Sequence, residues 1–182
     1  MATPNYIGAN ASRIILKGSS RMRDRLWHYL QNAKFKADYL CELSKRASTW
    51  GNIYSAFLAL SSAGSVAAWA VWDQFPYVWA AIVALSQVLH VAKPYIPFLR
   101  YEKEYMELCF KYEFLFLKYE KLWFRYEKAA EDEECLEQEF YELRNDEMDF
   151  LNGLKHVHVP DFQGILKKAS QKTREELNNI FF

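Results

Sequence analysis

A long stretch almost without charge is the feature that most constrains how this chain can fold. Residues 47 to 92 contain a single acidic residue, Asp73, and no Lys or Arg. Asp73 divides the stretch into uncharged runs of 26 and 19 residues. A helix needs roughly 20 mainly apolar residues to cross the hydrocarbon core of a bilayer. The sequence therefore predicts two transmembrane helices, over residues 50–72 and 75–92.

The residues that flank these runs predict a hairpin with a defined orientation. Residues 73–76 are Asp, Gln, Phe and Pro, which favour a tight turn. Basic residues lie outside the hairpin, at positions 45 and 46 before it and at 93, 100 and 103 after it. Cytoplasmic loops of membrane proteins carry an excess of Lys and Arg, so we expect a multi-pass protein with both termini in the cytoplasm. The alternative is that both runs form a buried hairpin in the core of a soluble domain.

Polar residues within the two runs have two interpretations. They are Asn52, Ser55 and Ser62 in the first run and Gln87 and His90 in the second. In the first run, small and large side chains fall on different faces of a helix, and a small face lets two helices approach closely. The polar residues therefore belong either to the packing between the two spans or to a polar path through an oligomer.

The residues before the first run predict an amphipathic helix from Arg21 to Ser48. Its apolar residues recur in steps of four and three, which places them on one helical face: Leu26, Leu30, Ala33, Ala37 and Leu40. The other faces carry several Lys and Arg residues. This basic surface suits an anionic membrane leaflet, an acidic partner or plain contact with solvent.

A heptad repeat follows the second run. Four Tyr residues lie seven apart with Leu residues between them, and together they form a helix-packing seam: Tyr105, Leu108, Tyr112, Leu115, Tyr119, Leu122 and Tyr126. This spacing is typical of coiled coils. Because no helix breaker occurs before Gly153, the pattern predicts one cytoplasmic helix of about 50 residues and roughly 75 Å.

Two further features of this predicted long helix bear on its partners. A second apolar stripe, formed by Phe110, Leu117 and Phe124, lies away from the seam. One neighbour cannot cover both, so we expect packing on the N-terminal helix and on another copy, which makes a homo-oligomer. Residues 131–149 contain ten acidic residues and one Arg, which form either a solvated face or a docking surface for a basic protein.

The predicted fold class is all-α, in four segments. They are the N-terminal segment and amphipathic helix (1–48), the transmembrane hairpin (49–99), the long heptad helix (100–154) and a C-terminal link with a short helix (155–182). No phosphate-binding Gly-rich loop, catalytic triad or metal-ligand pattern occurs, so we expect a non-enzymatic protein without cofactor or metal. Cys41, Cys109 and Cys135 lie far apart and are expected to be reduced.

This layout resembles the SLATT-like two-transmembrane effectors of bacterial anti-phage operons, including retron and cyclic-nucleotide systems. The resemblance covers about residues 22–150. It rests on Lys45 and Arg46, the two uncharged runs, and Lys/Arg-Tyr-Glu units that begin at Lys111, Lys118 and Arg125.

The resemblance implies a toxic effector of abortive infection, located in the bacterial inner membrane. Inhibitory or sensor proteins, or a nucleoprotein, would hold it inactive until its hairpins assemble and disrupt the lipid bilayer. We expect no direct binding of nucleic acid. The alternatives are a membrane-anchored scaffold that recruits a cytosolic complex through the long helix, and a small transporter or channel subunit.

Overall fold

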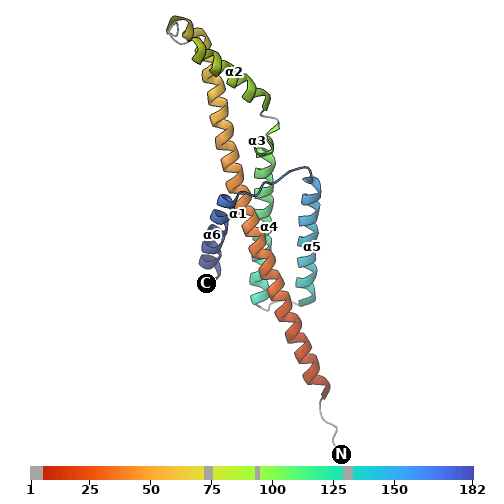
Figure 1. Cartoon of the computed structure of the whole chain (residues 1–182). Coiled ribbons are helices and arrows are strands. Elements are labelled where there is room, and N and C mark those ends of the chain that lie inside the picture. Colours follow the sequence, from red (N-terminus) through yellow and green to blue (C-terminus); the bar gives the residue numbers. More distant parts are fainter. Residues whose placement is uncertain (1–5, 72–75, 93–94, 129–132) are drawn as a thin grey trace, which may run out of the picture.

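The computed structural model describes residues 6–71, 76–92, 95–128 and 133–182; for 6–20, 62–71, 76, 79 and 97 it describes the backbone only. Within these ranges every regular element is a helix (Figure 1). The helices are α1 (Tyr6–Val71), α2 (Pro76–Ala92), α3 (Pro97–Arg100), α4 (Glu102–Glu127), α5 (Glu133–Gly153) and α6 (Gln163–Phe181).

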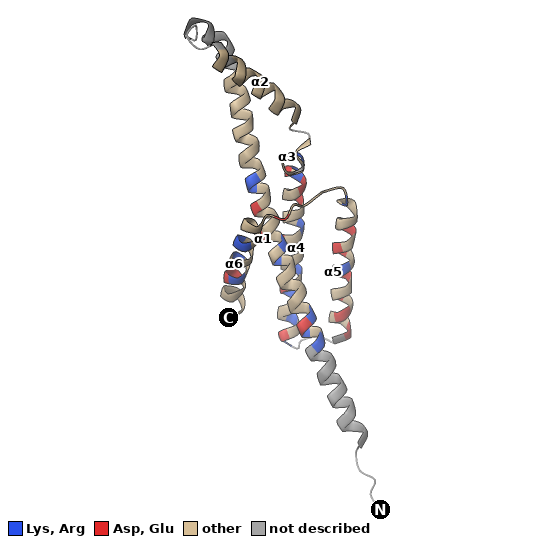
Figure 2. Ribbon diagram, viewed as in Figure 1, with Lys and Arg blue, Asp and Glu red and all other residues tan. Residues whose placement is uncertain are grey.

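The other helices are arranged along helix α1 (Figure 1). Its 66 residues make a rod of roughly 100 Å. Residues 21–48 of α1 pack with α4, α5 and α6, and we call this assembly the bundle. Residues 49–71 of α1 project beyond it, α2 returns beside them, and we call these two segments the arm (Figure 1). Every helical segment of the bundle carries charged side chains, whereas residues 49–71 and 76–92 carry none (Figure 2).

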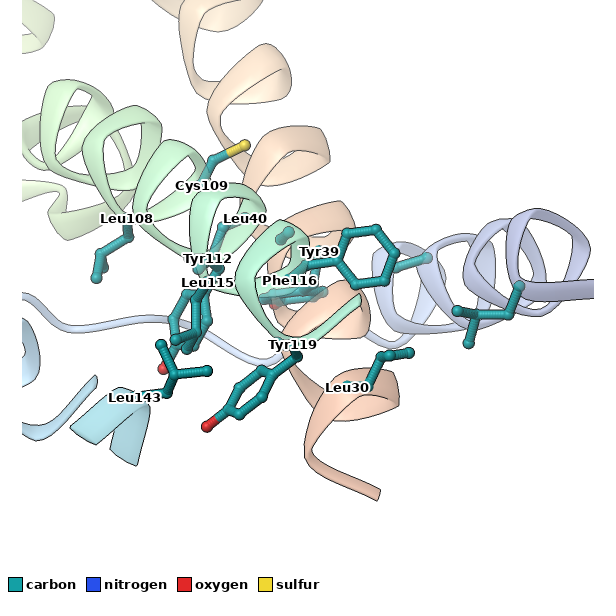
Figure 3. Close-up of a cluster of buried hydrophobic side chains, with 14 of the residues drawn as sticks. Leu30, Tyr39, Leu40, Leu108, Cys109, Tyr112, Leu115, Phe116, Tyr119 and Leu143 are labelled. Carbon is teal, nitrogen blue, oxygen red and sulfur yellow. The ribbon is translucent and has the colours of Figure 1, made fainter. Parts of the chain in front are cut away.

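The core of the bundle forms where α1 meets α4 (Figure 3). The α1 face that the sequence predicted to be apolar is buried, with Leu26 and Leu30 fully inaccessible to solvent. On α4, six of the seven seam residues are buried, and Tyr126 is partly buried against the same core. The periods of the two apolar faces therefore match one another, which allows α1 and α4 to pack along most of the length of α4.

The heptad region is two helices, and the prediction of one long helix over 100–154 is wrong. Helix α4 ends at Glu127, and α5 returns antiparallel to it. Lys118 pairs with Asp146 at 2.8 Å, and the Tyr112 and Phe150 rings lie 5.2 Å apart. Folding back lets the apolar seam of α5 pack on that of α4 within one chain; the seam of α5 is formed by Leu136, Phe140 and Leu143 and continues to Glu147. A single long helix would leave both halves in need of an external partner.

No helix within the described ranges is both long enough and apolar enough to cross a membrane. This finding contradicts the predicted two-span transmembrane hairpin and the multi-pass placement in the inner membrane. The prediction relied on the absence of charge, but 12 of the 23 residues from 50 to 72 are Gly, Ala or Ser. Helix α2 has 17 residues, or roughly 26 Å, against a hydrocarbon core of roughly 30 Å. The predicted turn, centred on Asp73, lies largely outside the described residues.

Residues 154–162 carry the chain from α5 across to α6 on the other side of α1 (Figure 1). Two buried Tyr side chains hold this link. Tyr39 donates its hydroxyl hydrogen to the Pro160 carbonyl and accepts a hydrogen bond from the Phe162 N–H at 3.2 Å. Tyr105 donates to the His158 carbonyl at 2.7 Å. These bonds fix the position of the link where the bundle meets the arm.

Helix α6 covers the remaining side of α1. Its buried residues recur every four positions and form one stripe: Ile165, Ala169, Thr173 and Leu177. Near its end, Phe181 contacts the Trp27 ring edge-on at 5.1 Å and stacks on Phe124 at 5.6 Å. The C-terminal segment is therefore an integral part of the bundle.

Candidate functional site

The arm exposes large apolar side chains on both of its helices. On α1, Trp50 is 60% exposed and Leu60 is 73% exposed. On α2, Tyr77, Val88 and Val91 are 89%, 64% and 65% exposed. Single exposed apolar residues are common, but a contiguous apolar surface on a segment without charge marks an interaction site.

The polar residues that the sequence singled out in this region do not meet inside the arm. Asn52, Ser55, Gln87 and His90 are each exposed, and the side chain of Ser62 lies outside the described residues. The Ser55 hydroxyl donates to the Gly51 carbonyl of its own helix at 2.8 Å. Asn52, Ser55, Gln87 and His90 therefore take no part in the packing between the two arm helices, and the polar path through an oligomer stays a prediction.

Among the arm side chains that the structure describes, two other Ser residues are buried. Ser61 is 9% exposed and donates to the Phe57 carbonyl at 2.9 Å; Ser86 is 7% exposed and donates to the Val83 carbonyl at 2.8 Å. Each hydroxyl is satisfied by its own helix, which allows a small polar side chain to be buried at low cost. Sequence reasoning missed both: in the first run it selected the helical face of Asn52, Ser55 and Ser62, and Ser61 lies about 100° around the helix from Ser62.

An apolar pocket lies at the junction of the arm and the bundle. We call it the junction pocket, and its cavity volume is about 560 Å³. Its lining comes from α1, α2, the α3 region and the link before α6: Trp50, Ile53, Tyr54, Phe57, Leu89, Ile96, Phe98, Leu99 and Phe162. The rings of Phe98 and Phe162 meet edge to face, with centroids 5.5 Å apart. None of the nine lining residues is charged.

A buried ionic cluster joins α1, α4 and α6. Asp38 accepts hydrogen bonds from Lys172 at 2.6 Å and from the Thr173 hydroxyl at 2.8 Å. Lys34 pairs with Glu176 at 2.7 Å and with Glu113 at 3.2 Å. The side chains of Asp38 and Lys34 are 1% and 7% exposed. We call these residues the Lys34 cluster; Lys34 and Asp38 are its buried members, and their partners Lys172, Glu113 and Glu176 are 51%, 37% and 36% exposed.

The Lys34 cluster shifts the pKa values of its members. Burial acts to lower the pKa of Lys34, but Glu176, Asp38 and Glu113 outweigh it and hold this pKa above 10.5. For Glu176, burial acts to raise the pKa, but hydrogen bonds and charge from Lys34 and Lys172 hold it below 4.5. Lys34 and Glu176 are therefore both ionised across the neutral range, and their ion pair links α1 to α6.

An acidic residue at a seam position of α5 has its partners inside the chain. Glu147 is 5% exposed, pairs with Lys36 at 3.0 Å and with Arg144, and accepts a hydrogen bond from the Tyr112 hydroxyl at 3.3 Å. Burial, with Glu147 nearby, raises the pKa of Tyr112 above its usual 10.0. Much of the basic surface predicted on the N-terminal helix is thus used internally, since Lys34 and Lys36 both pair with acids of other helices.

Cys41 of α1 and Cys109 of α4 form a disulfide, with their Cα atoms 5.2 Å apart. This corrects the expectation that the cysteines are reduced. The two residues are 68 positions apart in sequence, so only the register of α1 on α4 reveals the pair. Cys135 is exposed and free.

The second apolar stripe of α4 faces solvent. Of its predicted residues, Phe110 is 65% exposed and Leu117 54%; Phe114, which lies between them and was not part of the predicted stripe, is 61% exposed. Phe124 is partly covered by α6 through Phe181. This stripe is a second candidate interaction surface on the bundle, smaller than the arm and bordered by charged residues.

The described residues offer no arrangement that would hold a metal ion, since no three His, Cys, Asp or Glu side chains among them lie close enough together. Comparisons with protein-family models, with curated proteins and with solved structures find no match to this chain.

Proposed function

We propose that this chain is a self-assembling, non-enzymatic helical protein in which the arm of one copy packs on the arms of others. The observation that carries the proposal is the uncharged arm, whose two helices both expose large apolar side chains beyond a bundle that already has its own core. A helix that is apolar on several faces has to be covered. Its cover in this proposal is the same surface of another copy.

The chemistry of the arm favours a second copy over a charged partner. Residues 49–71 and 76–92 offer no charge with which another protein could form complementary pairs. Identical surfaces meet naturally in a symmetric homo-oligomer, where the same patch is buried on both copies.

The magnitude indicates that the arm can hold two copies together. Burying the exposed part of one such side chain contributes about 1 to 2 kcal/mol. Among the described side chains of the arm, the following large apolar residues are exposed: Trp50, Ile53, Leu60, Tyr77, Val78, Leu85, Val88 and Val91. A symmetric contact buries them on both copies, so full burial contributes about 16 to 32 kcal/mol per pair, against an association cost of about 4 to 15 kcal/mol. Partial burial of this surface is therefore sufficient for assembly that depends on concentration.

The resemblance to SLATT-like effectors extends the proposal to regulation. In this extension the assembled form is the active state of an anti-phage effector, and inhibitory or sensor proteins hold single copies apart. The exposed stripe at Phe110, Phe114 and Leu117 is the surface on the bundle at which such a partner would dock. Crossing the membrane is not part of this proposal.

Sedimentation velocity in detergent-free buffer tests the assembly. The wild-type chain should form oligomers whose fraction rises with concentration, and Leu60→Lys with Val88→Lys should leave a monomer. The matched control is Phe110→Lys with Leu117→Lys, which places the same charges on the bundle stripe and should leave assembly intact. If only the control pair dissociates the oligomer, the stripe is the assembly surface, and a scaffold that acts through α4 becomes the better account.

Flotation with phospholipid vesicles is a second, independent test of the proposal. A chain that is monomeric alone, floats with vesicles and loses flotation in the Leu60→Lys, Val88→Lys variant would overturn self-assembly. In cells, expression without the neighbouring genes should arrest growth, and the same variant should relieve the arrest. Unimpeded growth at confirmed expression would contradict the effector extension while leaving assembly in vitro to be judged on its own.

A further inference from the structure

One wall of the junction pocket is formed by helix α1. Its α1 wall consists of Trp50, Ile53, Tyr54 and Phe57, which lie at steps of three, one and three and therefore form a stripe along two turns of the helix. The stripe is roughly 10 Å long. Leu89 and the residues around α3 form the opposite wall. The pocket thus follows the helix axis and suits an elongated occupant.

The walls of the pocket are held in place by contacts within the chain. Phe162 closes one side, and its backbone N–H is fixed by the Tyr39 hydroxyl at 3.2 Å. The Phe162 ring is held against Phe98. At the base of the arm, α1 and α4 approach closely, since a Cβ on Gly51 would lie 3.4 Å from a carboxylate oxygen of Glu102. Preformed walls reduce the ordering cost of binding.

The chemistry of the lining decides the class of ligand. The nine lining residues contribute only two polar side-chain atoms, the Trp50 indole nitrogen and the Tyr54 hydroxyl oxygen. A charged or strongly polar group would lose its hydration without gaining ionic partners, at a cost of several kcal/mol. A volume of about 560 Å³ lies within the range of small-molecule sites, roughly 300 to 1,000 Å³.

We propose that the junction pocket binds one acyl chain, laid along the α1 stripe with its polar end towards solvent. This inference goes beyond the proposed function, because assembly through the arm requires no ligand; of the nine lining residues only Trp50 and Ile53 also belong to the proposed assembly surface. Charges of both signs flank the bundle end: Arg46 lies one turn before Trp50, Arg100 follows Leu99, and Glu102 approaches Gly51. The assignment is therefore to the hydrocarbon chain and not to a particular headgroup.

The test uses cis-parinarate, a fatty acid whose fluorescence rises in an apolar site. With the full chain, the fluorescence should increase to saturation at one probe per chain, and palmitate should displace the probe. Displacement by palmitate alone assigns a free fatty acid as the source. Displacement also by a monomeric short-chain phosphatidylcholine extends the source to phospholipid. Absence of saturation, or of displacement by either compound, overturns the proposal.

Two variants on the same helix separate the pocket from the arm surface. Leu89→Glu places a carboxylate among the lining residues and should weaken binding at least about tenfold. Val91→Glu makes the same change two positions away, outside the lining, and should leave parinarate binding unchanged although it weakens self-assembly. Equal loss in both variants would mean general adsorption to the arm, and the proposal would fail. Far-UV circular dichroism of both variants confirms that each is folded.

The concentration dependence of binding distinguishes failure of this inference from failure of the proposed assembly. If the pocket is open in the assembled state, parinarate binding per chain stays constant as the protein concentration rises through the range in which oligomers form. If binding disappears over that range, a second copy fills the pocket and the acyl-chain assignment is wrong. Binding by a chain that never assembles would support the pocket and refute only the proposed function.

Discussion

The Lys34 cluster should be the most sensitive polar site in the bundle, and Asp38→Ala tests this. Asp38 is 1% exposed and accepts hydrogen bonds from Lys172 at 2.6 Å and Thr173 at 2.8 Å. Removing the carboxylate leaves the Thr173 hydroxyl, which is buried, without this acceptor. An orphaned buried hydroxyl costs about 1 to 3 kcal/mol.

The loss of the Asp38 charge also affects its two Lys partners. The free-energy cost depends on whether each Lys can be solvated by water or keeps another acidic partner. Lys172 is 51% exposed and can return to water, so its share is discounted to about 1 kcal/mol or less. Lys34 is buried but keeps Glu176 and Glu113. Together with the orphaned hydroxyl, these terms predict that Asp38→Ala lowers the free energy of unfolding by about 3 kcal/mol.

Urea denaturation at neutral pH, followed by far-UV circular dichroism, measures this difference. Lys172→Met is the matched control, because it removes the exposed partner and should cost about 1 kcal/mol or less. A cost below about 1 kcal/mol for Asp38→Ala would show that the buried carboxylate contributes little net stability. If Asp38→Ala and Lys172→Met lower the free energy of unfolding equally, the loss of the ion pair explains both. The argument that the burial of Asp38 sets the size of its effect would then be refuted.

Three further predictions concern the core, the Tyr seam and the disulfide. Leu122→Ala, at a fully buried position, should cost about 2 to 5 kcal/mol in urea denaturation, whereas Leu117→Ala, at a 54% exposed position, should cost about 0.5 kcal/mol or less. Burial raises the pKa of Tyr105 from 10.0 to about 12, so the folded chain retains a proton that the unfolded chain releases. The stability from this shift should be intact below pH 10 and fall as the pH rises towards about 12, an effect that Tyr105→Phe should reduce in alkaline denaturation curves. Cys41→Ser opens the loop to Cys109, 68 positions away, and should cost about 4 kcal/mol, with no further loss when reductant is added.

The apolar faces of the bundle helices could be predicted because apolar residues spaced at the helical period lie on the face of the helix that is buried. Leu26 and Leu30 of α1 and Tyr105 and Tyr119 of α4 are all at 0% exposure, on the faces that the spacing indicated. Whether those faces meet within one chain or between chains is not contained in a period. A heptad seam looks the same in one long helix with an external partner as in two helices folded back on one another.

Contacts between distant residues and the choice of face within the arm could not be predicted. The Cys41–Cys109 disulfide depends on the register of two helices that are remote in sequence. In the arm, each residue advances the helix by about 100°, so Ser61 and its neighbour point in different directions. The prediction of two transmembrane helices also took the absence of charge as a sign of high hydropathy. Residues 50–72 carry no charge, but their many Gly, Ala and Ser residues lower their hydropathy.

Distances between copies test the central claim most directly. Spin labels at Val88→Cys on the arm and, separately, at Phe110→Cys on the bundle can be placed in a Cys135→Ser chain, because Cys41 and Cys109 are already joined. Double electron–electron resonance should then give a defined short distance between copies for the arm label and a longer or absent one for the bundle label. A short distance for the bundle label alone, or no coupling for the arm label at concentrations where oligomers form, would contradict assembly through the arm.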